Sequence, residues 1–216
     1  MNMGIKERRE REKNKRRNSI LKAAIQVYDE EGYHAITMEK IAETAELGRA
    51  TLYLYFKTKD EIFIHAILSY SDFLRQRLEN LYANRAEIKD NLLESLWLTF
   101  IEFYEKDRKS FNATLYFHQC EMIRNMPKNL WVLLDRSGSQ IYSYLSRIMA
   151  YGIKQGVFRD CSAKTLAEVV WTSFVGIIHL ENSKHAMRQR GHMQITWQLA
   201  LEVLSKGILA KSRMNS

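Results

Sequence analysis

Between residues 49 and 59 the sequence places arginine, tyrosine and lysine at spacings that suit contact with a polyanion. A helix over this segment would turn Leu52, Tyr55 and Phe56 inward, because they follow the i, i+3, i+4 spacing of an apolar stripe. The opposite, exposed face then carries Arg49, Ala50, Tyr53 and Leu54. Arginine donates two hydrogen bonds to a guanine edge, and a tyrosine hydroxyl reaches a phosphate oxygen. The pattern therefore favours insertion into the major groove of DNA.

The elements around this face have the spacing of a helix-turn-helix. Residues 37–45 begin with a threonine suited to an N-cap and continue with apolar residues at helical intervals. Residues 46–48 interrupt that pattern before the short helix expected at 49–56. A helix, a tight turn and a second short helix define the motif. An amphipathic helix is expected before it at 18–32, ending on a glycine, and a long one after it at 59–82.

These residues also carry a resemblance. The stretches 32–33, 37–42 and 49–61 are similar to the DNA-binding domain of the TetR family of bacterial regulators. The resemblance covers about residues 18–65. It combines a helix cap, a helix-turn-helix and the string Thr-Leu-Tyr-x-Tyr-Phe-Lys-x-Lys at fixed offsets, which is far more specific than a helix-turn-helix pattern alone.

The resemblance implies DNA contacts at nine positions. Thr37 matches the family's cap of the second helix, whose hydroxyl and amide meet a phosphate. Lys57 and Lys59 match the basic start of the fourth helix, where the helix dipole favours an anion. The positions matched on the recognition helix are Arg49, Ala50, Thr51, Tyr53, Leu54 and Tyr55.

Two residues of the turn depart from the family pattern. Glu46 stands where glycine is usual, so a left-handed backbone there would be mildly strained. Gly48 stands where a serine cap is frequent, and the third helix thereby loses a side-chain acceptor. Neither departure changes the expected fold, but both affect the angle at which the recognition helix leaves the turn.

The composition predicts an all-α protein. One proline and 9 glycines in 216 residues are too few for the turns of a sandwich or barrel. Further helices are expected near 87–106, 108–124, 127–155, 162–183 and 192–211. We therefore expect a basic N-terminal arm (1–17), a three-helix helix-turn-helix DNA-binding domain (18–60) and a larger helical ligand-binding and dimerisation domain (61–216).

The arm is almost wholly polar, and the chain has a formal net charge of +8. The arm's cations are Lys6, Arg8, Arg9, Arg11, Lys13, Lys15, Arg16 and Arg17. They form either a solvated segment, disordered or helical, or an arm that grips the minor groove or adds nonspecific attraction to phosphates. The residues leave both interpretations open.

Aromatic stripes in the larger part predict either a packed core or the lining of a pocket. Members of the family have a ligand cavity in this domain, so the resemblance favours the interpretation that some of these residues line a pocket. Few charges interrupt the stripes, which favours an apolar or planar effector with a small polar head. The candidate lining residues are Trp97, Tyr104, Phe111, His118, Tyr144, Trp171 and His179. A histidine on an apolar face is otherwise a core residue.

The last two helices, 162–183 and 192–211, carry apolar residues on more than one face. Such helices need burial on two sides, and the family supplies the second side with a four-helix dimer interface. A two-fold dimer in turn predicts a palindromic operator on double-stranded DNA.

No catalytic, metal-binding or cofactor-binding motif is present, so no enzyme, metal or cofactor is expected. No signal peptide or bilayer span is recognisable, and we expect a cytoplasmic protein without a membrane partner. Cys120 and Cys161 are interpreted as free buried thiols. The expected function is a homodimeric transcriptional regulator, a repressor released by its effector, although an activator stays open. The alternatives are a basic helical protein that binds nucleic acid or anionic membranes nonspecifically, and an enzyme on a helical scaffold.

Overall fold

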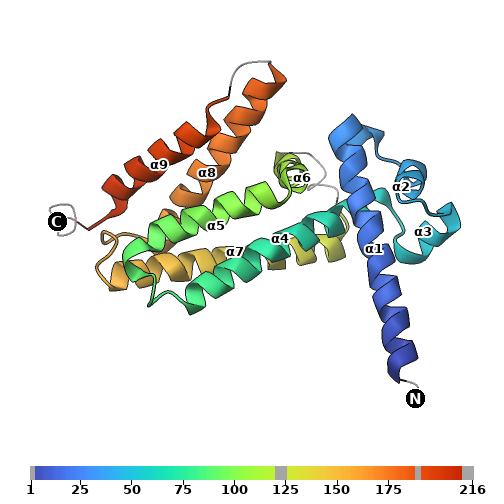
Figure 1. Ribbon diagram of the computed structural model, residues 1–216, viewed down its shortest axis with the longest axis horizontal. Coiled ribbons are helices and arrows are strands. Elements are labelled where there is room, and N and C mark those ends of the chain that lie inside the picture. The colour runs from blue at the N-terminus through green and yellow to red at the C-terminus, as the bar shows by residue number, and fades with distance from the viewer. Residues whose placement is uncertain (1–2, 120–125, 188–190, 211–216) are drawn as a thin grey trace. The chain divides into compact units, whose positions relative to one another are not determined.

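The computed structural model describes residues 3–119, 126–187 and 191–210, and in that part every regular element is a helix (Figure 1). The all-α prediction is confirmed. The α-helices are α1 (Met3–Glu31), α2 (Met38–Thr44), α3 (Arg49–Tyr55), α4 (Lys59–Ala83), α5 (Leu92–Lys106), α6 (Arg108–Gln119), α7 (Lys128–Lys154), α8 (Ala163–Ala186) and α9 (Met193–Ile208). Two short 3₁₀ turns lie at Tyr33–Ala35 and Lys89–Asn91.

The chain divides into two compact units. The first unit comprises residues 1–72 and 106–137, and the second unit comprises residues 73–105 and 138–216. The helix-turn-helix therefore shares its unit with α6, the start of α4 and the start of α7. This structural division differs from the functional boundaries expected at residues 17 and 60, which stay a prediction.

Local chemistry sets the ends of α1, α2 and α3. After α1, Gly32 adopts a positive φ of 82°, and its amide donates to the Tyr28 carbonyl at 2.8 Å. The Thr37 hydroxyl oxygen caps α2 by accepting from the Lys40 amide at 3.1 Å. Both expected departures in the turn are present, because Glu46 has a φ of 54° and Gly48 gives α3 no side-chain cap.

The basic N-terminal segment is part of α1. That helix runs without interruption from Met3 to Glu31, and residues 4–16 are all exposed. Of the interpretations left open by the sequence, the structure contains the solvated helical extension rather than a disordered arm.

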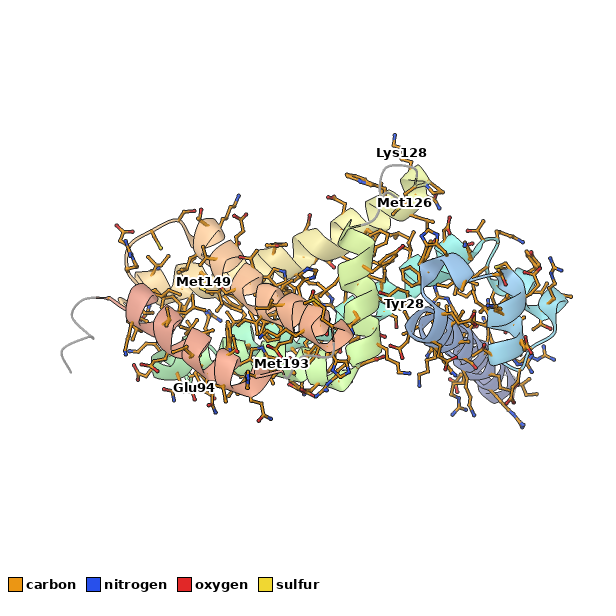
Figure 2. All side chains as sticks on the ribbon, turned by 90° about the horizontal axis from the view of Figure 1, so that it is seen from above. Tyr28, Glu94, Met126, Lys128, Met149 and Met193 are labelled. Carbon is orange, nitrogen blue, oxygen red and sulfur yellow. The ribbon has the colours of Figure 1, made fainter. Side chains whose placement is uncertain are left out.

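The core of the first unit packs α1 against α2, α3, α4 and α6. Fully buried residues include Ile20, Ile41, Leu52 and Phe63. α6 also contributes to this core with Ala113 and Phe117. The centre of the Tyr28 ring on α1, labelled in Figure 2, lies 5.5 Å from that of the Tyr116 ring.

Polar contacts reinforce that junction between α1 and α6. The Tyr28 hydroxyl donates to the Asn112 carbonyl at 3.4 Å, and the Lys109 ammonium pairs with the Asp29 carboxylate at 2.8 Å. The hydrogen bond to Asp29 raises the pKa of Lys109 above its ordinary value, which favours the charged ammonium. α6 is therefore fixed to the helix that supports the helix-turn-helix.

In the second unit, a close approach of ring and backbone orders the segment between α7 and α8. A Cβ added at Gly152 would lie 2.3 Å from the Phe158 ring, so only glycine allows this packing. The Arg159 amide donates to the Ile208 carbonyl at 2.8 Å, and the Ala210 amide donates to the Val157 carbonyl at 3.1 Å. These bonds tie the end of α9 to the loop before α8.

Two expectations outside the site need correction or fall outside the described residues. Cys161 is exposed, because it lies in the loop before α8, so its interpretation as a buried thiol is wrong. Cys120 lies outside the described residues. None of the described helices combines the length and hydropathy that a bilayer span requires.

Candidate nucleic-acid interface

The third helix presents the face that the sequence predicts. Leu52 and Phe56 are buried beneath α3, and Tyr55 is half-buried beside them. Leu54 points away from this core with 82% of its surface exposed, and Tyr53 lies on the same outer side. Arg49 and Ala50 are also exposed, and Thr51 is half-buried. A short helix with an apolar underside thus offers an arginine, a tyrosine and a leucine to a partner.

Arg49 is held in place by two neighbours. Its guanidinium pairs with the Glu39 carboxylate of α2 and lies 6.0 Å from the centre of the Tyr53 ring. The hydrogen bond to Tyr53, followed by the charge of Glu39, raises the pKa of Arg49 above its ordinary value. Because an exposed ion pair is weak, a base edge can replace Glu39 as the partner of this guanidinium.

Thr37 and Lys57 flank the recognition helix with groups that can reach phosphates. Both residues are exposed. The Thr37 hydroxyl uses its oxygen for the α2 cap, which leaves its proton available to a phosphate. The Lys57 ammonium donates to the Tyr53 carbonyl at 3.3 Å, so it lies against the end of α3.

The start of α4 differs from the expected open anion site. The Glu61 carboxylate accepts from the Lys57 amide at 2.7 Å, and the Glu61 amide donates to the Thr58 hydroxyl at 3.1 Å. This reciprocal cap uses an amide that a phosphate would otherwise take. The Lys59 ammonium donates to the Ile36 carbonyl at 2.9 Å and lies 5.0 Å from the centre of the Tyr33 ring. The structure therefore gives Lys59 partners within its own unit.

Arg17, one of the cations predicted in the basic arm, lies beside the end of the recognition helix. Its guanidinium lies 5.1 Å from the centre of the Phe56 ring, directly after α3. Helical spacing predicts this position, because Arg17 is three residues before buried Ile20 and seven before buried Ala24 and so lies on the core-facing side of α1.

In the second unit, α5, α8 and α9 form an aromatic cluster. The cluster consists of Trp97, Phe100, Phe103, Tyr104, Trp171, Phe174 and Trp197. The centre of the Phe174 ring lies 5.5 Å from that of Trp97, and 5.8 Å from the stacked ring of Trp197. Three candidate lining residues, Trp97, Tyr104 and Trp171, therefore belong to the same cluster.

The other four candidate lining residues lie elsewhere. Phe111 is buried in the first unit. Tyr144 donates to the Glu79 carboxylate at 2.8 Å, and this bond raises the pKa of the Tyr144 hydroxyl. His179 is exposed on α8, and the His118 side chain falls outside the described part of the structure.

Two indole N–H groups in the aromatic cluster have no hydrogen-bond partner among the described atoms. They belong to Trp97, which is 1% exposed, and Trp197, which is 5% exposed. Leaving a buried donor unsatisfied costs about 1–3 kcal/mol. Trp197 was not among the predicted site residues, because the last helix was interpreted as part of the dimer interface.

The outer faces of α8 and α9 expose a row of large apolar side chains. α8 and α9 lie side by side in the second unit (Figure 1). On α9 the row is Ile195, Leu199 and Val203, spaced by four residues, and on α8 it includes Val169 and Leu180. The prediction that these helices are apolar on more than one face is confirmed.

No group of three or more histidine, cysteine, aspartate or glutamate side chains suited to a metal ion occurs among the described residues.

Comparison with known proteins connects these features to one family. Residues 20–66 match the bacterial regulatory proteins of the tetR family. The chain is 25% identical over 171 residues to the HTH-type transcriptional regulator YhgD of Bacillus subtilis, covering 79% of this chain and 86% of that protein. It is 24% identical over 166 residues to the HTH-type transcriptional repressor KstR2 of Mycobacterium tuberculosis, covering 74% and 80%.

The fold agrees with that relationship. The solved structure of the fatty acid degradation regulator FadR from Bacillus halodurans superimposes with a TM-score of 0.69 at 17% identity, covering 87% of this chain and 93% of that one. The family is one of transcriptional regulators that bind DNA operators, not of enzymes. With its helix-turn-helix, its helical second unit and these relatives, the chain belongs to the TetR family of bacterial transcriptional regulators.

Proposed function

We propose that this protein is a homodimeric repressor that binds a palindromic operator through α3 and leaves it when a small, largely apolar effector occupies the second unit. The observation that carries the proposal is the exposed face of α3 above a closed core. Its relative KstR2 is a repressor, which supports repression over activation.

In this proposal the residues of the helix-turn-helix divide their work. Arg49 reads a base edge, because a guanidinium matches the two acceptors of guanine. Thr37, Tyr53 and Lys57 contact phosphates and set the register of the helix on the duplex. Ala50, Thr51, Leu54 and Tyr55 supply the close contact surface of the recognition helix, and Lys59 supports the loop before α2.

The dimer forms through the exposed apolar rows of α8 and α9. Large apolar side chains at four-residue spacing on two adjacent helices suit packing against the same face of a second copy. A two-fold dimer places two copies of α3 about 34–36 Å apart, or a multiple of that distance, to meet successive half-sites.

The effector is largely apolar and carries a hydrogen-bond acceptor. The aromatic cluster supplies the apolar surface, and the N–H groups of Trp97 and Trp197 supply two donors that no described residue satisfies. α4 runs from the first unit into the second. In this proposal, a change that the effector causes in the second unit reaches the helix-turn-helix through α4. A coupling of about 1–3 kcal/mol changes operator affinity by about 5- to 150-fold.

Capture of genomic fragments on the purified protein, at low and near-physiological salt, tests the DNA-binding part. Enrichment of discrete palindromic sites at both salt concentrations is the expected result. Uniform capture that disappears as salt rises would instead support nonspecific binding, which the exposed basic half of α1 favours.

The effector part needs a separate measurement on the palindrome so obtained. Release of the labelled palindrome is followed during titration with apolar compounds that have or lack a carbonyl group. Compounds with the acceptor should release the DNA at lower concentration than matched hydrocarbons. Equal potency of the two sets would contradict the role given to the indole donors.

A further inference from the structure

The N-terminal half of α1 is a charged surface that the helix-turn-helix does not use. Residues 3–17 extend the helix away from the core, and residues 4–16 are exposed. Between residues 6 and 17 there are eight cations, three carboxylates and no apolar side chain. A helix that binds a membrane surface needs an apolar face, so this composition points to a polyanion in water.

The cations of this extension fall into two stripes. At 100° per residue, Arg9, Lys13 and Arg16 lie on the line that continues to buried Ile20 and Ala24. With Lys6 they form the inner stripe. Arg8, Arg11 and Lys15 lie on the opposite side of the helix and form the outer stripe. Glu7, Glu10 and Glu12 lie on the flanks between the two stripes.

The inner stripe faces the same side of α1 as the recognition helix. Arg17, at the root of the stripe, lies over the Phe56 ring that follows α3. Figure 1 shows α1 continuing past α2 and α3 toward the N-terminus. Exposed Lys57 is the next residue after Phe56, so positive charge is continuous from the end of α3 onto α1.

We propose that the inner stripe of each protomer binds phosphates of the DNA that flanks the operator half-site read by α3. The inference rests on the proposed function, because it requires α3 to dock on a duplex. From Lys6 to Arg16 the stripe spans about 15 Å, which is about four base-pair steps. The outer stripe faces away from the duplex, and Arg8 already pairs with Glu12 at 3.3 Å.

Two matched variants of the full-length protein test the inference. The inner variant carries Arg9→Gln, Lys13→Gln and Arg16→Gln, and the outer variant carries Arg8→Gln, Arg11→Gln and Lys15→Gln. Each loses two arginines and one lysine, so the change in net charge is the same. Glutamine is a good helix former, and circular dichroism with thermal unfolding checks that both variants fold as the unmodified protein does.

The measured quantity is the slope of log affinity against log salt for the captured palindrome with about ten flanking base pairs on each side. A dimer that loses three phosphate contacts per protomer loses up to about 5 from the magnitude of this slope. We expect a decrease of about 3–5 for the inner variant and of less than about 1 for the outer variant. Removing the flanks should weaken the unmodified protein and leave the inner variant almost unchanged.

Equal slopes for the two variants, whether both unchanged or both reduced, would overturn the inference. So would loss of binding to phosphatidylserine vesicles by the inner variant when its DNA slope is unchanged, because the partner would then be a membrane. Failure of the proposed function has a different signature, in which the unmodified protein itself shows no preference for the palindrome.

Discussion

The helix-turn-helix and the aromatic cluster differ in whether their polar groups have hydrogen-bond partners. Around α3, side chains and backbone groups pair within the unit, as the Thr37 cap and the Lys59 contact with Ile36 show. In the aromatic cluster, Trp97 and Trp197 bury N–H groups that have no partner within the described part of the chain. The polar groups cited around α3 already have hydrogen-bond partners before DNA binds, whereas the two indole donors of the cluster remain available to a ligand. Under the proposed function, this difference distinguishes a DNA-binding surface whose polar groups already have partners from a site whose donors an effector would satisfy.

The largest effect should come from the core beneath the recognition helix. Leu52→Ala removes a fully buried side chain, so we expect the free energy of unfolding to fall by about 2–5 kcal/mol. Leu54→Ala, two residues away on the exposed face, should change it by less than about 0.5 kcal/mol. Urea denaturation followed by circular dichroism measures both. Similar losses for the two variants would contradict the assigned inner and outer faces of α3.

Arg49→Ala should weaken operator binding about tenfold or more and relax the preference at one base position in each half-site. Affinities for all single-base variants of the palindrome measure this. Glu39→Gln is the matched control, because it frees the guanidinium without removing it and should preserve the base preference. A uniform loss across all sequences would assign Arg49 to the phosphate backbone instead.

Removal of the unsatisfied donors should weaken effector binding. Trp97→Phe and Trp197→Phe keep an aromatic ring and delete the N–H group, so the effector affinity should fall about tenfold for each. Trp131→Phe, at an exposed position of α7, is the control and should leave the affinity unchanged. If the effector binds all three variants equally, the donors are structural.

A smaller effect separates the two lysines beside the turn. Lys57→Ala should lower the magnitude of the salt slope by about 1 for each protomer, because the proposed function places its exposed ammonium at a phosphate. Lys59→Ala should leave the slope unchanged and reduce thermal stability slightly, since its ammonium is held by the Ile36 carbonyl. A reduced slope for Lys59→Ala would show that this lysine leaves its internal partners on binding DNA.

The smallest expected effect depends on pH. Burial, and then the charge of Arg17, lower the pKa of His65 below its ordinary value. The unfolded chain therefore binds this proton more readily, and the free energy of unfolding should decrease as the pH falls below about 6.5. His65→Gln should flatten that dependence in urea denaturation between about pH 5 and pH 7. An unchanged dependence would locate the acid-sensitive group elsewhere.

Much of the helix-turn-helix followed from the sequence because its determinants are local. The Thr37 cap, the positive φ of Glu46 and the missing cap at Gly48 depend on residues within a few positions of one another. The inward face of α3 followed from periodicity for the same reason.

What the sequence did not reveal depends on contacts between distant segments. Lys59 is held by a carbonyl 23 residues earlier, and no local pattern indicates where a long side chain will turn. Trp197 meets the Phe174 ring of another helix, and the exposure of His179 depends on the rotation of α8. Periodicity predicts that a helix has an apolar side, but it does not tell which neighbour covers it.

α1 is an unbroken helix of 29 residues, so a small tilt at one end produces a large displacement at the other. Its length is about 43 Å, so a tilt of about 10° at the Gly32 end moves its first residues by about 7 Å, or two base-pair steps. The Tyr28 and Asp29 contacts with α6 lie close to that pivot. A displacement of α6 by a fraction of an ångström therefore becomes, at the far end of α1, a movement large enough to change which phosphates lie within reach.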